Sequence, residues 1–282
     1  MHLLSNQTNT VYAALRGAYP ELQRAQIADE MIIHQGTSFG DLKNDSELGI
    51  DKRLGKYFQD QLKTGIARIS VEGLEDIRTD GEQESWVTID PLDGSLNFKK
   101  RCGSQGLPIS SCITLLSKSG PDTCFKDIVA AGVIDLRNGD IWFSEFKESS
   151  RKTTLNSHYA KTDSSNKLDL TQQIVIAEFY YPENRERICR AFTGKKGWLR
   201  NPGSAAYEMA LVANGTSIAY ICDRQKQHEL GAGVALVLGA GGVAVGFDGK
   251  PLTNVGYTFN QQTSVILAAN QAIADQILEL LQ

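Results

Sequence analysis

Two aspartates near the start of a predicted helix are the residues best suited to chemistry. The stretch ESWVTIDPLDGSLNF, residues 84–98, places Asp90, Pro91, Leu92 and Asp93 directly after a short apolar run. Because Pro91 has no N–H group, we expect it to end a strand and to leave both carboxylates and the Leu92 carbonyl on a tight turn. Carboxylate and carbonyl oxygens are the ligands that Mg²⁺ prefers.

The residues after this turn are suited to binding an anion. Gly94 and Ser95 are expected to begin a helix, and the first N–H groups of a helix favour a negative charge such as phosphate. A metal next to such amides suits phosphoryl transfer, because the metal neutralises the phosphate while the amides orient it. The same residues also suit a simple turn with Asp93 as a helix cap, so this stretch alone leaves both interpretations open.

Another carboxylate precedes the stretch. Glu72 ends the apolar run 66–72 and is followed by Glu75 and Asp76. A hard ligand at the end of a strand would help to complete a metal site, whereas a solvated acidic loop is the simpler interpretation.

The motifs and their order resemble the inositol monophosphatase family, within the magnesium-dependent, lithium-sensitive phosphatases that include fructose-bisphosphatases and 3'-phosphoadenosine nucleotidases. ESWVTIDPLDGSLNF resembles the family signature DPxDGTxNF, and KNDSELGID resembles K…D…VTxxD. GSAAYEMALVANG is similar to GSAAxxLxxVAxG. HELGAGVALVLGAGG is similar to WDxAAGxxxxxxAGG, with eleven residues between Glu229 and Gly241.

The resemblance implies a metal-dependent phosphomonoesterase that hydrolyses a small phosphorylated metabolite: a sugar, inositol or nucleotide phosphate, with a bisphosphate among the options. Metal-activated water would attack in line, without a phosphoenzyme. Two or three Mg²⁺ ions are implied, with Mn²⁺ as an alternative. The implied fold is a layered α/β/α/β/α sandwich of the sugar phosphatase type, of mixed α+β and α/β class, and the implied assembly is a homodimer.

The resemblance also assigns metal ligands by position. Glu72, Asp90 and the Leu92 carbonyl would hold the first ion. Asp90, Asp93 and Glu229 would hold the second, and a third, weaker ion would lie near Glu72.

Catalytic and phosphate-binding roles are implied in the same way. Ser95 would bind phosphate and, with Glu72 and Asp90, complete the catalytic group, while the Gly94 and Ser95 amides would hold the phosphoryl oxygens. The candidate substrate-binding residues are Asp93, Arg200, Ser204, Ala205, Cys222 and Arg224.

The sequence departs from the family pattern at positions that would bind the metal and the substrate. His228-Glu229 stands where the family has Trp-Asp, and the longer Glu adds roughly 1.5 Å of reach at a site where Mg²⁺ demands near-ideal geometry. We interpret His228 as a surface or packing imidazole, because one flanking histidine is weak evidence for a ligand. Cys222 replaces a Glu that grips a substrate hydroxyl, and a thiol is a poor substitute for that contact.

Loss of that Glu argues against plain inositol monophosphate as the substrate. We hypothesise that nearby cations bind the second anionic group of a sugar or nucleotide bisphosphate. Arg224 is the preferred candidate, whereas the run 99–101 also suits a solvated charged surface. The cations considered are Lys99, Lys100, Arg101, Arg200, Arg224 and Lys226.

Composition excludes several other classes of protein. The net charge of −4 and the pI of 5.7 give no basic field for nucleic acid. Five scattered cysteines without CxxC spacing, no signal peptide and no apolar run of about 20 residues predict a soluble, cytoplasmic protein without a membrane contact.

Apolar periodicity predicts two lobes with a ligand site between them. Residues 1–150 would form an α+β lobe with most metal ligands, and residues 151–282 a smaller α/β lobe that completes the site. Helices are expected at 8–35 (interrupted at Gly17 to Pro20), 51–63, 183–192, 203–214, 228–239 and 271–281. Strands are expected at 66–72, 85–90, 109–116, 128–135, 141–145, 173–178, 217–222, 243–247 and 264–268.

Two other functions compete with catalysis. A family member with an altered metal ligand would suit a catalytically weak or inactive binding or regulatory protein, although the presence of Glu72, Asp90 and Asp93 favours an enzyme. A dinucleotide-binding loop at GAGVALVLGAGG is disfavoured, because its glycines lie within and after a predicted helix.

Overall fold

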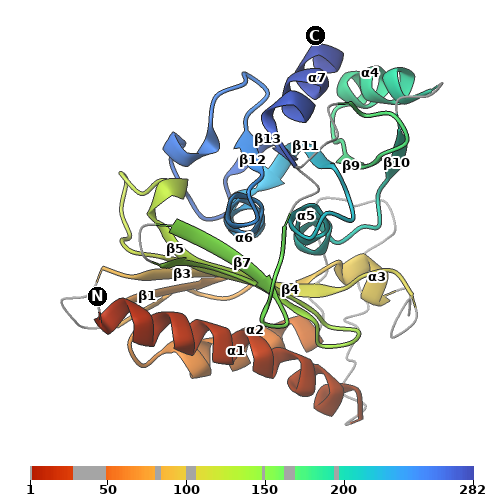
Figure 1. The fold of residues 1–282 in the computed structure, drawn as a ribbon. Helices are drawn as coiled ribbons and strands as arrows, with labels where there is room; N and C mark the ends of the chain where they lie inside the picture. Colours follow the sequence, from red (N-terminus) through yellow and green to blue (C-terminus); the bar gives the residue numbers. More distant parts are fainter. Residues whose placement is uncertain are drawn as a thin grey trace.

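Helices and sheets alternate in five layers in the computed structural model (Figure 1). The structure describes residues 2–27, 49–79, 84–99, 106–147, 150–161, 169–193 and 197–282. The layers of helices are α1 (His2–Ile27) with α2 (Gly49–Leu62), α5 (Ala205–Ala213) with α6 (Gln227–Gly239), and α4 (Pro182–Phe192) with α7 (Gln271–Leu281). The first pair covers the outer face of one sheet, the second lies between the sheets, and the third covers the other sheet. The expected α/β/α/β/α sandwich is confirmed.

The larger sheet has the strand order β2-β1-β3-β4-β5-β6-β7-β8. Its strands are β1 (Arg68–Val71), β2 (Ile77–Arg78), β3 (Trp86–Asp93), β4 (Ser110–Leu116), β5 (Ile128–Asp135), β6 (Ile141–Lys147), β7 (Ser150–Leu155) and β8 (His158–Tyr159). β1 and β3 pair in parallel, and the other pairs are antiparallel. The short helix α3 (Ser95–Lys99) follows β3 directly.

The smaller sheet has the strand order β10-β9-β11-β13-β12. Its strands are β9 (Ile174–Glu178), β10 (Trp198–Arg200), β11 (Ala219–Lys226), β12 (Val243–Val245) and β13 (Gln262–Ala268). Two 3₁₀ turns, Phe125–Asp127 and Leu252–Asn254, lie in the connections.

Three buried clusters fill the spaces between the layers. α1 and α2 pack on the larger sheet through residues such as Leu15 and Phe58. The middle cluster joins both sheets through α5 and α6, with Met209 and Leu230 among its members. The third packs α4 and α7 on the smaller sheet. The helix α6 is thus buried along nearly its whole length, and its first turn can be held rigidly.

The end of β3 differs from expectation. Pro91 was predicted to end the strand, which is wrong: β3 continues to Asp93. Asp90 pairs with Cys112 and Asp93 with Ser110, so the register shifts between them. This bulge places two residues of β3 opposite one residue of β4, which allows the strand to continue past a residue that has no N–H group to donate.

The predicted break in the first helix is also wrong, because α1 runs through Gly17 and Pro20 without interruption. A Cβ at Gly17 would collide with the ring of Tyr57, and the Tyr57 hydroxyl donates a hydrogen bond to the Ala14 carbonyl at 3.1 Å. Gly17 therefore allows α2 to pack closely against α1 and does not form a turn.

The change from one sheet to the other comes later than residue 150. β7 and β8 extend the larger sheet to Tyr159, and the smaller sheet begins at Ile174. The division into two lobes remains our proposal, with its boundary between these residues. Within the described residues, no helix is long and apolar enough to span a membrane.

The contact of α5 with α6 gives a prediction on stability. A Cβ at Gly233 would lie 2.8 Å from the Met209 Cβ, a separation that requires the helices to shift. Overpacking of this kind costs about 1–3 kcal/mol, and the better helix propensity of Ala returns at most about 1 kcal/mol. Gly233→Ala should therefore lower the free energy of unfolding in urea. Gly120→Ala, with no atom near the new Cβ, should stay within about 0.5 kcal/mol of wild type.

Candidate active site

Three carboxylates and one imidazole come together where the larger sheet meets α6. Glu72 directly follows β1, Asp90 lies in β3, and His228 and Glu229 lie in the first turn of α6. One ligand atom from each of these residues lies within 4.8 Å of all the others. We call these four residues the acidic cluster. The predicted metal ligands Glu72, Asp90 and Glu229 are thus neighbours in the structure.

Each carboxylate of the cluster is held by a hydrogen-bond donor on one oxygen. Lys226 Nζ lies 2.5 Å from Glu72 Oε1, and the Leu92 amide donates to Asp90 Oδ1 at 2.9 Å. The Gln225 side-chain amide donates to Glu229 Oε2. These contacts fix the orientation of the three side chains.

Burial and mutual repulsion change the pKa values of the carboxylates in the cluster. Burial, followed by the neighbouring carboxylates, raises the pKa of Asp90 and of Glu229 well above the usual range. Burial also opposes ionisation of Glu72, but its hydrogen bond to His228 and the charges of His228 and Lys226 lower its pKa to about 2. Carboxylates that repel one another in a buried place fit a divalent cation, which would neutralise them.

Asp93 faces α5 and is not one of the residues in this cluster. Its Oδ2 accepts hydrogen bonds from the Ser204 hydroxyl at 2.7 Å, the Ser110 hydroxyl at 3.0 Å and the Ala206 amide at 2.7 Å. Its Oδ1 accepts from the Ala205 amide at 3.1 Å. The carboxylate therefore caps the start of α5 from another layer of the fold. Its role as a metal ligand remains a proposal.

Gly94 joins β3 to α3 in a conformation that suits glycine. Its φ is +83°, and a Cβ there would lie 2.8 Å from the Pro108 carbonyl oxygen. Next to it, the Asn97 side chain donates to the Pro108 and Pro202 carbonyls at 2.8 and 2.9 Å. The expected helix start at Ser95 is confirmed, and its amides lie directly after Asp93 in the chain.

The predicted substrate-binding residues lie in three places. Ser204 and Ala205 contact Asp93 at the start of α5. Cys222 is buried, and burial raises the pKa of its thiol. The Arg224 guanidinium lies 5.8 and 5.5 Å from the ring centres of Tyr180 and Tyr181, and its Nε donates to Gln262 at 2.7 Å.

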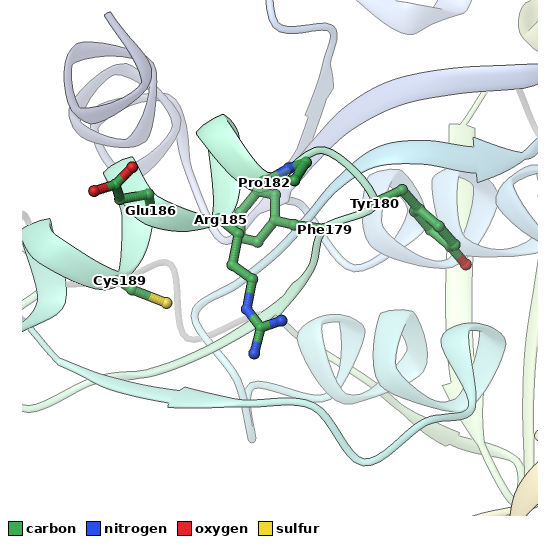
Figure 2. Close-up of a pocket in the computed structure, with 6 residues that line it drawn as sticks. All are labelled: Phe179, Tyr180, Pro182, Arg185, Glu186 and Cys189. Atoms are coloured by element: carbon green, nitrogen blue, oxygen red, sulfur yellow. The ribbon is translucent and has the colours of Figure 1, made fainter.

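Arg200 lines a hollow of about 870 Å³ along α4 and β10. A smaller hollow of about 350 Å³ adjoins the start of α4 (Figure 2), where Tyr180 extends away from Glu186 and Cys189. Neither hollow contains a residue of the acidic cluster. Lys43, Asp45, Lys100 and Arg101 lie outside the described residues.

Sequence reasoning missed several residues that the structure places at the site. Lys226 was noted only as a cation near position 229, although it pairs with Glu72. Glu178 is the register partner of Cys222 on the neighbouring strand, and burial raises its pKa. Gln225 and Glu178 both accept a hydrogen bond from the Tyr220 hydroxyl. The alternation of β11 places Tyr220 on the same face as the predicted Cys222, but it could not have found Gln225, which follows a register shift after Cys222, nor Glu178 on β9.

Comparison with known proteins identifies the family. The family model described as "Inositol monophosphatase family" matches residues 126–282, which is more than half of the chain. The chain belongs to the inositol monophosphatase family. As a member, it is a metal-dependent phosphatase that acts on a phosphorylated metabolite. The match begins after the Asp90 motif, which supports the family independently of that motif.

Curated relatives and solved structures agree with this family. A fructose-1,6-bisphosphatase/inositol-1-monophosphatase from Archaeoglobus fulgidus is 27% identical over 72% of this chain and 71% of that protein. An inositol-1-monophosphatase from Bacillus subtilis is 27% identical over 84% of this chain and 83% of that protein. The structure of the extragenic suppressor protein suhB from Bartonella henselae has a TM-score of 0.75, with 20% identity over 97% of each chain, and it supports the fold.

The different surroundings of the two aspartates give opposite predictions for metal-free protein. Asp93→Asn should lower the free energy of unfolding by about 1–3 kcal/mol, because an amide nitrogen would face one of four N–H or O–H donors. Asp90→Asn should raise it at pH 7, since it removes a repelled charge while its oxygen can still accept from Leu92. Urea denaturation in EDTA measures both variants.

The pH dependence of the Asp90 variant provides a check. A carboxylate whose pKa is raised on folding stabilises the protein below its unfolded pKa, and this stabilisation is lost as pH rises toward the folded value. The gain from Asp90→Asn should therefore be larger at pH 7 than at pH 4. Destabilisation by Asp90→Asn, or stabilisation by Asp93→Asn, would contradict the roles assigned here.

Proposed function

We propose that this protein hydrolyses a small phosphomonoester by in-line attack of water at the acidic cluster. The observation that supports this most directly is the acidic cluster itself, whose Asp90 lies in the strand that leads directly into Gly94 and Ser95. The N–H groups at the start of α3 can donate hydrogen bonds to the phosphoryl oxygens, and the carboxylates supply the cation site that a phosphate ester needs nearby.

Glu72, Asp90 and Glu229 would hold the cation, with the Leu92 carbonyl and Asp93 as the further ligands that the family resemblance implies. When bound, the ion supplies positive charge that stabilises the phosphate and lowers the pKa of water. Ser95 would bind phosphate, and Glu72 with Ser95 would orient the attacking water. Asp93 holds α5 against β3, so that Ser204 and Ala205 stay beside the same site.

We infer the number of ions and the assembly from the family resemblance, which implies two or three ions and a homodimer. The resemblance also implies Mg²⁺ as the general family ion, with Mn²⁺ as the alternative. A cytoplasmic location is proposed on the same basis. Light scattering with size-exclusion chromatography will establish the assembly.

We propose a substrate with a second anionic group. The relative from Archaeoglobus fulgidus carries fructose-1,6-bisphosphatase in its name. In this chain, Arg224 follows the Cys222 position that would otherwise grip a substrate hydroxyl, and it is half-buried beside two tyrosines. A guanidinium in that position suits a second phosphate.

The alternative is a binding or regulatory protein without turnover. The Lys226 contact with Glu72 is its best support, because an ammonium group in the cluster partly neutralises it. Catalysis is favoured, since one lysine leaves Asp90 and Glu229 with raised pKa values and therefore in need of further positive charge.

Phosphate release measures the proposed activity. The substrates are inositol phosphates, fructose 1,6-bisphosphate, 3'-phosphoadenosine phosphates and sugar 1-phosphates, each with Mg²⁺ or Mn²⁺. We expect turnover of at least one substrate, its loss in EDTA, and a fall in kcat of about 100-fold or more in Glu72→Gln. Glu75→Gln, at an exposed neighbouring position, is the matched control and should keep full activity. An absence of phosphate release from the whole panel would favour the binding alternative.

Arg224 is expected to distinguish bisphosphates from monophosphates. Loss of one charge-assisted contact in Arg224→Ala should raise KM for a bisphosphate about tenfold or more, with a much smaller effect on a monophosphate. Arg190→Ala, at an exposed position of α4, is the control and should affect both substrates equally. Equal effects of Arg224→Ala on both substrates would remove Arg224 from the specificity proposal.

A further inference from the structure

We propose that His228 is a ligand of the metal ion and gives this site a preference for a first-row transition ion such as Mn²⁺ or Zn²⁺ over Mg²⁺. The proposal rests on the metal-dependent function proposed above and concerns a residue outside the family's ligand pattern, which has Trp at this position. It also replaces our interpretation of His228 as a packing residue alone.

The spacing of the ligand atoms suits a shared ion. His228 Nε2 lies 3.2 Å from Glu72 Oε2 and 3.8 Å from Glu229 Oε1. Two atoms that each lie roughly 2.1 Å from one ion are separated by about 3–4 Å. Both His228 distances fall in this range, and one ligand atom of each of the four residues lies within 4.8 Å of the others.

The carboxylates present their remaining oxygens to this nitrogen. Lys226 binds Oε1 of Glu72 and Gln225 binds Oε2 of Glu229, while the His228 contacts are to Oε2 and Oε1 of the same two groups. Donors outside the cluster thus hold one oxygen of Glu72 and one of Glu229, and the other oxygen of each faces the imidazole, which shares a hydrogen bond with Glu72. Such outer contacts are typical of metal sites, where they orient the ligands.

Burial of the ring supports a polar role at Nε2. His228 is fully buried, and its ring packs 4.8 Å from the ring of Phe259. Within the described residues its Nδ1 is buried without a hydrogen-bond partner, so the polar contacts of the ring all lie on the side of the carboxylates. An apolar ring would provide the packing against Phe259 equally well, whereas the Nε2 contacts require an imidazole.

The chemistry of the ligand set decides which ion is favoured. Mg²⁺ prefers oxygen ligands in near-ideal octahedral geometry. Imidazole suits transition ions, which bind nitrogen and carboxylate oxygen together. Three carboxylates with one imidazole therefore shift the balance away from Mg²⁺.

Pulsed electron paramagnetic resonance of the full-length protein loaded with Mn²⁺ tests the ligation directly. We expect coupling from a coordinated imidazole ¹⁴N in wild type and its loss in His228→Trp, which restores the family residue, and in His228→Asn. His158→Asn, at an exposed position on β8, should retain the coupling. Circular dichroism checks that the variants are folded.

Calorimetry tests the preference. The ratio of the Kd for Mg²⁺ to the Kd for Mn²⁺ should fall about tenfold or more in both His228 variants and stay at the wild-type value in His158→Asn. Wild type without nitrogen coupling, coupling that persists in the His228 variants, or an unchanged ratio would overturn the proposal.

These results separate the two proposals. Nitrogen coupling without phosphate release would support His228 as a ligand and contradict the phosphatase function. Phosphate release from protein whose ion has only oxygen ligands would support the phosphatase function and contradict His228 as a ligand.

Discussion

Repulsion among Glu72, Asp90 and Glu229 is the constraint around which the structure is organised. Three carboxylates in one largely buried place disfavour ionisation, and only a rigid surrounding structure can hold them together. Two of them are fixed by the parallel pairing of β1 with β3, in which the Glu72 amide donates to the Ile89 carbonyl at 3.0 Å. The third depends on α6, whose position is set by contacts with both sheets. The site therefore exists only when the layers are assembled.

Asp93 links the larger sheet to the start of α5. The bulge in β3 gives it a different register from Asp90, so two nearby aspartates in one strand face different surroundings. One remains among carboxylates, and the other receives four hydrogen bonds from Ser110 and the first residues of α5. Because these residues come from distant parts of the sequence, the same carboxylate joins the sheet to the middle layer of helices, directly before the segment that we propose binds phosphate.

Much of this arrangement could be predicted from local patterns. The ranges of β5 and α7 follow from apolar periodicity, and the start of α3 follows from Gly94 and its positive φ. The errors arise where a tertiary contact overrides a local signal. Pro20 lies within α1 because packing against α2 and the sheet outweighs its cost, and Pro91 stays in β3 because a bulge accommodates it. β7 was missed because its Ser- and Thr-rich sequence resembles a linker, although Thr153 is buried and donates to the Leu236 carbonyl in α6.

The site residues also divide into those that local sequence predicts and those that depend on tertiary contacts. Glu72, Asp90 and Glu229 could be predicted from motifs, whereas the partners of each carboxylate could not, since Lys226 and Glu72 are 154 positions apart. The residues that depart from the family pattern nearly all lie in one segment, from Cys222 to Glu229, which forms the end of β11 and the start of α6. Glu72 and Asp90 come from the larger sheet and keep the family pattern, and Ser95, in the helix that follows, stands at the family's Thr or Ser position. In our proposals, the reaction class therefore depends on one layer of the fold, while the choice of ion and substrate depends on the junction of β11 and α6.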